Sequence, residues 1–502
     1  MFIRQKKNKS GKVSVQIIDK SYGSYKVVKT LGCSTSEIEI KELLVKARQW
    51  MIDHGGQINI DFEGEKLHAE KLLDSISAHK QVGLELTLGK IFDSIGFGII
   101  QDELFKWLVL YRLIYPKSKL KTTEYLYRYH GIEYDVNQVY RYLDKLNTEH
   151  KEIVQQISFE HTKQILGGEI NIIFYDVTTI YFEIEKEDEL RRTGFSKDGK
   201  HQNPQIVLGL LVATNGYPLA YEIFNGSQFE GHTMLPVLES FKRKYQLERL
   251  VVVADSGLLS KPNVKLLKEN NYEFIIGARI KAESTSIKKK ILDLHLSNLE
   301  TAIIKKDDLK LIVSYSEKRA KKDAHNRERG ITRLEKQIKK GKLSKSNINN
   351  KGYNKYLKIE NEIKVHIDYE KFHEDAKWDG LKGYLTNSPL KAETIIENYS
   401  QLWQIETAFR VSKTDLKVRP IYHRLQKRIE AHICLNFVAY KVYKELERVL
   451  KQKKSALSPT KVIEIATNLF EIELKLPGSQ ESIKKKLILT EEHRKVAHLF
   501  NF

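Results

Sequence analysis

The sequence has few cysteines, few prolines and no long hydrophobic run. Its two cysteines, Cys33 and Cys434, lie far apart, so neither a disulfide framework nor a cysteine-based zinc site is supported. With 9 Pro and 27 Gly among 502 residues, and 41% hydrophobic residues, the composition excludes the disordered and collagen-like classes. The longest apolar run, residues 206–213, is far shorter than the roughly 20 residues that cross a bilayer. We therefore expect a folded protein of several domains with no membrane partner.

The first residues also lack the pattern of a secretory signal. The segment MFIRQKKNKS is basic, but it leads into KVSVQIID and not into an apolar stretch with a small-residue cleavage site. We expect a cytoplasmic protein.

Positive charge is abundant and unevenly distributed. The formal net charge is +20. The surplus is concentrated in three segments, which are residues 1–30 (+7), 316–345 (+8) and 416–454 (+8). Concentrated basic patches suit a polyanion, although any one of these runs is equally well explained as a solvated helix face.

The periodicity changes several times along the chain. It predicts six parts, which are a small β module (1–62), a helical region (63–165), the first part of an α/β core (166–280), an insertion subdomain (281–390), a helix completing the core (391–425) and a helical C-terminal region (426–502). The β module reads as a hairpin around SYGS.

Within the helical region, two short helices joined by a tight connection suggest a helix-turn-helix. TTEYLYRYHG offers Thr122 as an N-cap and Gly131 as a terminator, and VNQVYRYLDKL follows. The second helix carries candidate DNA contacts, which are Asn137, Gln138, Arg141 and Lys145. Short helix pairs are common, so an ordinary helical pair is the competing interpretation.

The centre of the chain alternates strands and helices. Three strand-like runs (170–184, 204–214 and 217–226, the last two joined by Asn215-Gly216) precede a helix, a strand, a helix and a strand. The order β-β-β-α-β-α-β predicts an α/β fold whose mixed-sheet core is ribonuclease H-like. Such a fold does not by itself establish chemistry.

Two carboxylates stand out by their position on strands. Asp176 lies inside the first strand of the core, and Asp255 ends the strand VVVAD. An Asp among Val, Ile and Phe is costly to desolvate unless it is paired, hydrogen-bonded or bound to a metal. If the first and fourth strands are neighbours, the two side chains converge, and a divalent cation removes their repulsion. The alternative for Asp255 is a strand-end residue that caps a turn.

A helix after the insertion supplies a third carboxylate. If the segment 391–416 forms one helix, its spacing places five residues on one face, which are Tyr399, Trp403, Glu406, Arg410 and Lys413. One face then offers an anion, two cations and two aromatic rings. The competing interpretations are an i,i+4 salt bridge from Glu406 to Arg410 and packing of Trp403 against the sheet.

These motifs resemble those of the DDE transposases of bacterial insertion sequences, in the branch with a β-rich insertion between the second Asp and the Glu. The resemblance rests on YDVTTIYF, VVVADSG and YSQLWQIETAFRVSK, and further stretches agree, namely GFSKDGKHQNPQIVLGLL, GSQFEGHT, SEKRAKKDAHNRERG, DGLKGYLTN and RPIYHRLQKRIEAHICLNFVAY. It covers residues 170 to 445. Tyr399, Glu406 and Lys413 fit the family spacing of the last motif, but Leu402 stands where the family has Arg.

The resemblance implies that Asp176, Asp255 and Glu406 hold two Mg²⁺ ions, with Mn²⁺ as a substitute, for cleavage and strand transfer of double-stranded DNA at element ends and target. It implies DNA contacts by Tyr399, Trp403, Arg410 and Lys413. We expect the basic quartet, Lys318, Arg319, Lys321 and Lys322, to line the DNA path. A homodimer in the synaptic complex is expected by analogy, as is association with the bacterial nucleoid.

Three other functions compete with this one. An aspartyl-phosphate phosphatase is set aside because Thr178 stands where such a motif has its second Asp. A ribonuclease H-like nuclease or resolvase without strand transfer stays open. So does a transposase-derived DNA-binding protein without catalytic activity.

Overall fold

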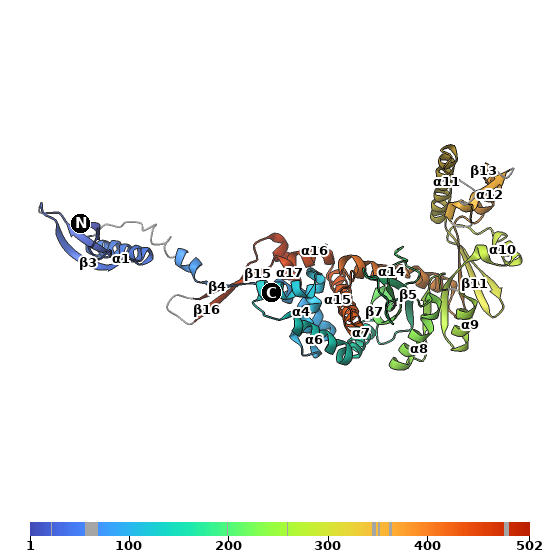
Figure 1. Ribbon diagram of the computed structural model, residues 1–502, viewed down its shortest axis with the longest axis horizontal. Helices are drawn as coiled ribbons and strands as arrows, with labels where there is room; N and C mark the ends of the chain where they lie inside the picture. The colour runs from blue at the N-terminus through green and yellow to red at the C-terminus, as the bar shows by residue number, and fades with distance from the viewer. Residues whose placement is uncertain are drawn as a thin grey trace. The chain divides into compact units, whose positions relative to one another are not determined.

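The structure is a computed structural model that describes the chain except residues 22, 56–68, 198, 259, 344–347, 350–351, 361–363 and 476–480 (Figure 1). The chain divides into two compact units, and each is described by itself. The first comprises Met1–Leu84, Arg128–Gly131 and Ile465–Phe502, and the second comprises Glu85–Tyr127 and Ile132–Glu464.

The first unit holds two small antiparallel sheets. One has the order β1-β2-β3 (Phe2–Lys7, Val13–Asp19 and Lys26–Ser34) and packs against α1 (Glu37–Gly55) through Val15, Ile17 and Ala47. The expected hairpin is therefore present as β2 and β3, with β1 added at its edge. The other sheet has the order β16-β15-β4 (Ser482–Lys486, Phe470–Lys475 and Ile76–Gln81), and α17 (Glu491–Phe500) follows it in the chain.

The second unit begins with a helical region. Its elements are η1 (Glu85–Gly89), α3 (Lys90–Ile95), η2 (Phe97–Ile99), α4 (Glu103–Ile114), α5 (Lys119–His130), α6 (Val136–Lys145), η3 (Leu146–His150) and α7 (Lys151–Ile165). The prediction that Thr122 caps the second of these long helices is wrong. Ser118 does so, because its hydroxyl accepts from Lys121 N at 3.1 Å, and Thr122 lies one turn inside α5.

The long basic helix predicted near the C-terminus is α15 (Gln426–Gln452), followed by α16 (Pro459–Thr467). Most of its residues from Ile429 to Leu446 are buried. Even Lys441 is buried, and its ammonium donates to Ser158 O and to the hydroxyl of Thr162. Among the described residues, no helix is long and apolar enough to cross a membrane.

The core of the second unit is an eight-stranded sheet. Its elements are β5 (Ile172–Tyr181), β6 (Gln205–Ala213), η4 (Thr214–Gly216), β7 (Pro218–Asn225), η5 (Glu230–His232), α8 (Met234–Tyr245), β8 (Val251–Ala254), α9 (Lys261–Glu269), β9 (Glu273–Ala278) and η6 (Ile280–Ala282). The sheet order is β10-β11-β14-β9-β8-β5-β6-β7, with β5, β8 and β9 parallel. The order β7-β6-β5-β8-β9 is that of a ribonuclease H-like core, so the predicted fold class is confirmed.

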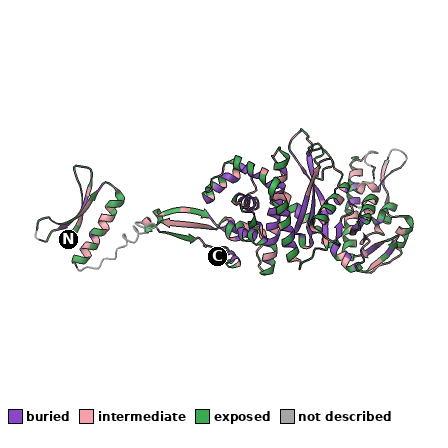
Figure 2. Cartoon of the chain, turned by 90° about the horizontal axis from the view of Figure 1, so that it is seen from below, coloured by how far each residue is buried: buried purple, intermediate pink, exposed green. Residues whose placement is uncertain are grey.

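The two faces of this sheet are covered differently. Side chains at odd positions of β5, such as Ile173, Tyr175 and Val177, join one large buried cluster with residues of α8 and α9. Figure 2 shows the strands of this sheet as largely buried. Thr178 and Ile180, at even positions, line a small cavity with residues of α14 and α15. Because side chains alternate along a strand, Asp176 lies on the face of α14 and α15.

The segment 281–390 contributes to the same sheet and also forms a small cluster of its own. Its elements are α10 (Thr285–Leu292), β10 (Thr301–Lys306), β11 (Leu309–Tyr315), α11 (Glu317–Lys339), η8 (Gly352–Tyr356), β12 (Leu357–Glu360), β13 (Lys364–Ile367), α12 (Tyr369–Ala376) and β14 (Leu381–Thr386). Strands β14, β11 and β10 extend the sheet beyond β9. A separate hydrophobic cluster joins α11 to Tyr356, Leu357 and Ile367.

The single helix expected over 391–416 is broken. It is replaced by α13 (Ala392–Ser400), α14 (Trp403–Arg410) and the π-helical segment η9 (Val411–Asp415). At the break, Leu402 N donates to Tyr399 O at 3.1 Å, a tight i to i−3 bond in place of the α-helical bond. This turn changes the phase of the helix, so the prediction that Tyr399 shares one continuous helical face with the later residues is wrong.

Candidate active site

Asp176 lies in β5, and Asp255 directly follows β8, the parallel neighbour of β5. Ile172, Ile173 and Phe174 of β5 are paired with Val251, Val252 and Val253 of β8. The same register, continued by two residues along both strands, places Asp176 opposite Asp255. The two residues are therefore neighbours across this strand pair, with Asp176 in the middle of β5 and Asp255 directly after the end of β8.

The Asp176 carboxylate lies in a crowded ionic environment. Lys197 Nζ is 3.7 Å from Asp176 Oδ1 and 3.3 Å from Glu230 Oε1, and it donates to Val177 O at 2.6 Å. Burial raises the pKa of Asp176 to about 6, and the negative charges of Asp255 and Glu230 act in the same direction, whereas Lys197 opposes them. The site thus holds more negative charge than its one lysine neutralises.

Asp255 is exposed and shapes the turn that follows β8. One of its carboxylate oxygens, Oδ1, accepts from Gly257 N at 2.8 Å and from Leu258 N at 3.2 Å. This is the turn-capping role named above as the alternative for Asp255. The capping uses one carboxylate oxygen, so it leaves Oδ2 for another ligand.

Tyr399 lies close enough to Asp255 and Glu406 to be affected by the charges of both. The ring is buried, 5.0 Å from the ring of Tyr384 between centroids, and Lys382 Nζ lies 4.4 Å from its centroid. Burial raises the pKa of Tyr399 to about 12, followed by the charges of Asp255 and, more weakly, Glu406. Both carboxylates are therefore within electrostatic range of one phenol.

The remaining residues of the last motif occupy α14 and η9. Glu406 and Arg410 are exposed on α14, Lys413 is half-buried in η9, and 55% of Trp403 is exposed. Leu402, at the family Arg position, is buried in the packing at the helix break. The buried Leu402 is thus accommodated as a core residue.

The residues present suit a hard divalent cation by donor chemistry. Such ions take carboxylate oxygens, and the Lys197 ammonium stands in for a cation beside Asp176 and Glu230. Within the described parts of the chain, no group of three or more His, Cys, Asp or Glu side chains is close enough together to hold a metal ion. The donor set fits a metal, but its members are not gathered around one point.

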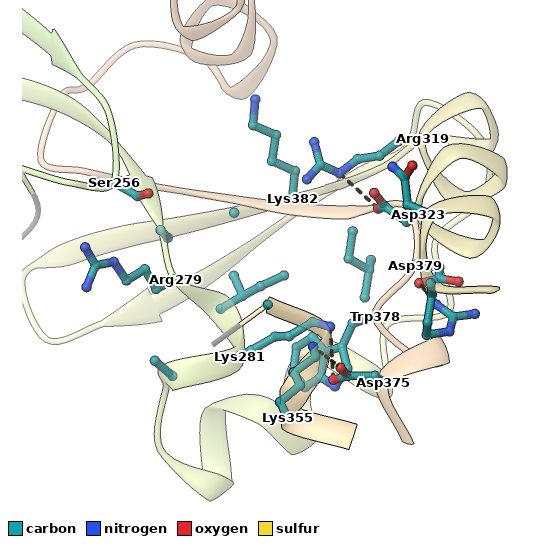
Figure 3. Close-up of a pocket in the computed structure, with 18 of the residues that line it drawn as sticks. Ser256, Arg279, Lys281, Arg319, Asp323, Lys355, Asp375, Trp378, Asp379 and Lys382 are labelled. Carbon is teal, nitrogen blue, oxygen red and sulfur yellow. Dashed lines mark hydrogen bonds and ion pairs between the residues drawn. The ribbon is translucent and has the colours of Figure 1, made fainter. Parts of the chain in front are cut away.

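A pocket opens beside this site. It has a volume of about 1060 Å³ and extends from Ser256, next to Asp255, to α11 (Figure 3). Arg319 pairs with Asp323, and Asp375 binds Lys281 and Lys355, whereas neither Arg279 nor Lys382 has an ion-pair partner among the described residues. The pocket therefore presents unneutralised positive charge close to the carboxylates.

The other predicted DNA contacts lie on two helices. All four members of the basic quartet are exposed on the first turns of α11. Asn137, Gln138 and Arg141 are exposed on α6. Gln138 is also part of a capping box, in which its Oε1 accepts from Asp135 N at 2.8 Å.

Lys197, Glu230 and Lys382 were not predicted as site residues. Each falls within a stretch that carries the family resemblance, namely GFSKDGKHQNPQIVLGLL, GSQFEGHT and DGLKGYLTN. The signal was present in those stretches, but nothing in their spacing relates them to Asp176 or Tyr399.

Comparisons with known proteins support one family. A family model described as "Transposase DDE domain" matches residues 167–441, more than half of the chain. Comparison with curated proteins gave no match.

Among solved structures, the piggyBac transposase synaptic complex with hairpin DNA is similar at 8% identity and a TM-score of 0.36, over 78% of this chain and 80% of that chain. The Mos1 transposase paired-end complex with the left transposon end is similar at 12% identity and a TM-score of 0.16, over 32% of this chain and 53% of that one. A Mos1 mariner paired-end complex with Mn gives 13% identity and a TM-score of 0.15, over 47% and 75%.

These TM-scores are low, so the assignment rests on the family model. The match spans both strand carboxylates, the insertion and α14. The chain belongs to the transposases with a DDE domain.

Proposed function

We propose that Asp176, Asp255 and Glu406 are the catalytic carboxylates with which this transposase cleaves the ends of its element and joins them to target DNA. The observation that supports the proposal is the register of β5 and β8, which aligns Asp176 with Asp255 when it is continued by two residues. Helix α14 contacts β5, and α13 contacts β8. The charges of Asp255 and Glu406 both act on the pKa of the Tyr399 phenol, which supports one shared site.

The metal in this proposal is Mg²⁺, as two ions, with Mn²⁺ as a substitute. Asp176, Asp255 and Glu406 would hold these ions, which would supply activation of the attacking oxygen and stabilisation of the leaving oxygen in an in-line phosphodiester displacement. Asp176 must be ionised to serve as a ligand, and its raised pKa makes the ionised form costly in the metal-free protein. Lys197 offsets part of that cost from 3.7 Å away.

Several groups of this chain are positioned to bind DNA. We assign the phosphates next to the cut to Arg410 and Lys413, and stacking on an unpaired base to the exposed ring of Trp403. Because the phenol of Tyr399 is buried against Tyr384 and Lys382, we assign it to positioning these groups. The pocket and the basic quartet form the DNA path over the site.

Further parts of the proposal concern recognition and assembly. Asn137 and Arg141 on α6 contact duplex DNA at the element end. Gln138 also contacts this DNA, while its Oε1 accepts from Asp135 N in the capping box. Two copies of the chain synapse the two ends as a homodimer. We expect the protein to act in the cytoplasm, on the nucleoid when bound to DNA.

The test is a pair of assays on the DNA ends that flank the coding sequence. Asp176→Asn, Asp255→Asn and Glu406→Gln should each abolish metal-dependent cleavage while DNA affinity stays within a fewfold. Glu397→Gln, on the exposed side of α13, is the matched control and should retain activity.

Strand transfer of a precut end separates the alternatives. Joining of the precut end supports the transposase, and cleavage without joining would identify a nuclease or resolvase. Binding without either reaction would identify an inactive descendant. Undiminished cleavage by Asp176→Asn would show that the proposed site is wrong.

A further inference from the structure

A second, buried group of basic side chains lies away from the carboxylates. Arg112 at the end of α4, Lys119 at the start of α5 and His432 in α15 are only 5%, 6% and 5% exposed. His423, in the segment before α15, faces His432 at 5.5 Å between ring centroids. His423 and His432 belong to RPIYHRLQKRIEAHICLNFVAY, a stretch to which the proposed function gives no role.

Arg112 donates hydrogen bonds only to neutral acceptors. Its Nη2 donates to His432 Nδ1 at 3.4 Å, and its Nη1 donates to Lys417 O at 3.5 Å. Because His432 Nδ1 accepts from Arg112, this imidazole is neutral and its proton is on Nε2, which donates to Val418 O at 2.9 Å. Arg112 Nε is buried without a hydrogen-bond partner.

Lys119 is less satisfied still. Among the described residues, no hydrogen-bond acceptor binds its ammonium, and no carboxylate forms an ion pair with either Arg112 or Lys119. Asp144 lies near His423, but its carboxylate is bound by Arg428 at 2.8 Å and Lys427 at 3.2 Å. Buried cations without a counter-ion are strongly unfavourable.

Burial and the positive charges of neighbouring groups disfavour the charged forms of these four side chains. Burial lowers the pKa of Arg112 to about 10. It lowers the pKa of Lys119 well below its usual range, and the charge of Arg112 adds to the effect. It lowers the pKa of His423 to about 4, with Lys119 and Arg112 adding. A bound anion would raise the pKa of each of these groups, because a nearby negative charge stabilises the positively charged form.

We propose that Arg112 and Lys119, with His423 and His432 beside them, form a binding site for a phosphate oxyanion between α4, α5 and the segment before α15. Arg112 Nε is buried without a hydrogen-bond partner, and Lys119 Nζ makes no hydrogen bond or ion pair with the described residues, so a phosphate offers acceptors to both. Lys119 is also the first residue of α5, where the helix dipole favours an anion. The phosphate belongs either to the backbone of bound DNA or to a free phosphate ion.

The site would couple two parts of the second unit. Arg112 and Lys119 come from the helical region, whereas Lys417, Val418 and His423 follow the motif that carries Glu406. A phosphate held here fixes the segment after η9 against α4 and α5. This role is separate from the chemistry assigned to the three carboxylates.

The first measurement is the melting temperature of the full chain in phosphate-free buffer. Inorganic phosphate is titrated against NaCl at matched ionic strength. The melting temperature of the wild type should rise with the logarithm of phosphate concentration, beyond the effect of NaCl. Lys119→Met should lose this increment without losing stability in phosphate-free buffer, because it removes an uncompensated buried charge. Lys121→Met, which removes an exposed lysine paired with Glu124, should keep the increment.

The second measurement is DNA affinity as a function of salt. If the phosphate belongs to DNA, Lys119→Met should lower affinity about tenfold and reduce the salt slope by about 1. If it is a free ion, DNA affinity stays unchanged while the phosphate increment is lost. Only the DNA source rests on the proposed function, and the titration with inorganic phosphate tests the site without any reaction.

The proposal is overturned if Lys119→Met leaves both the phosphate increment and the DNA affinity at wild-type values. If Lys119→Met does not fold, Arg112→Met is judged by the same two criteria. Loss of cleavage in the carboxylate variants with an intact phosphate increment would leave this site standing, so the two proposals fail separately.

Discussion

Asp176→Asn should make the metal-free protein more stable while it removes catalysis. The carboxyl is half-buried near two other acids, and its pKa is raised from 3.8 to about 6. That difference corresponds to about 3 kcal/mol of destabilisation when the group is ionised in both the folded and unfolded states. Asn imitates the protonated carboxyl without its charge, so it should recover a stabilisation of this order.

The pH dependence has a definite sign. Below pH 3.8 the carboxyl is protonated in both states, and it contributes nothing to the pH dependence of unfolding. Between pH 3.8 and about 6 the unfolded chain loses the proton first, so the stability of the wild type falls as pH rises. The gain from Asp176→Asn should therefore be about 1 kcal/mol at pH 4.5 and about 3 kcal/mol at pH 7.5.

Urea denaturation in EDTA, followed by tryptophan fluorescence at both pH values, measures this gain. Asp144→Asn is the control with the opposite sign, because its hydrogen bond with Arg428 lowers the pKa of Asp144 and its loss should destabilise the fold. A gain that is absent at pH 7.5, or equal at both pH values, would refute the description of Asp176 as a strained carboxylate.

Three further predictions test packing and DNA binding. Gly330→Ala should destabilise the fold by roughly 1–3 kcal/mol in thermal or urea unfolding, because the new Cβ would lie 2.1 Å from the ring of Tyr353; unchanged stability would contradict the packing of α11. Lys382→Met should weaken DNA binding and reduce its salt slope by about 1 in a fluorescence anisotropy titration, and an unchanged slope would remove the pocket from the DNA path. Neutralising the basic quartet should reduce that slope by up to about 4; if affinity and slope both stay unchanged, α11 is a scaffold and not a DNA contact.

The strands of the core were predictable because their side chains are almost continuously apolar. The runs around Asp176 and Asp255 became β5 and β8, which pair, and this pairing is the condition on which the convergence of the two carboxylates depended. The sequence did not predict that β10, β11 and β14 extend the same sheet, because the pattern of side chains along a strand does not indicate which sheet the strand joins.

The helical predictions failed where tertiary packing overrides periodicity. Nothing in the spacing of Tyr399 and Glu406 indicates the tight turn at Leu402, which places the tyrosine ring against Tyr384 and Lys382. The basic composition of α15 likewise does not indicate that Lys441 is buried with two hydrogen-bond acceptors.

Lys197 and Glu230 show why part of the site could not be predicted. Lys197 comes from the connection between β5 and β6, and Glu230 comes from the short helix after β7. Their approach to Asp176 depends on how these connections fold back onto the sheet, and that information is not carried by residue spacing.

The most direct test of the central claim, that Asp176 and Glu406 act in one catalytic centre, is a double-variant comparison of single-turnover cleavage in Mg²⁺ and in Mn²⁺. If the two carboxylates act as a unit, Asp176→Asn and Glu406→Gln should each reduce the cleavage rate to background. The double variant should then have the same cleavage rate as each single variant. Cleavage within a fewfold of wild type in Glu406→Gln, with cleavage lost in Asp176→Asn, would contradict the account.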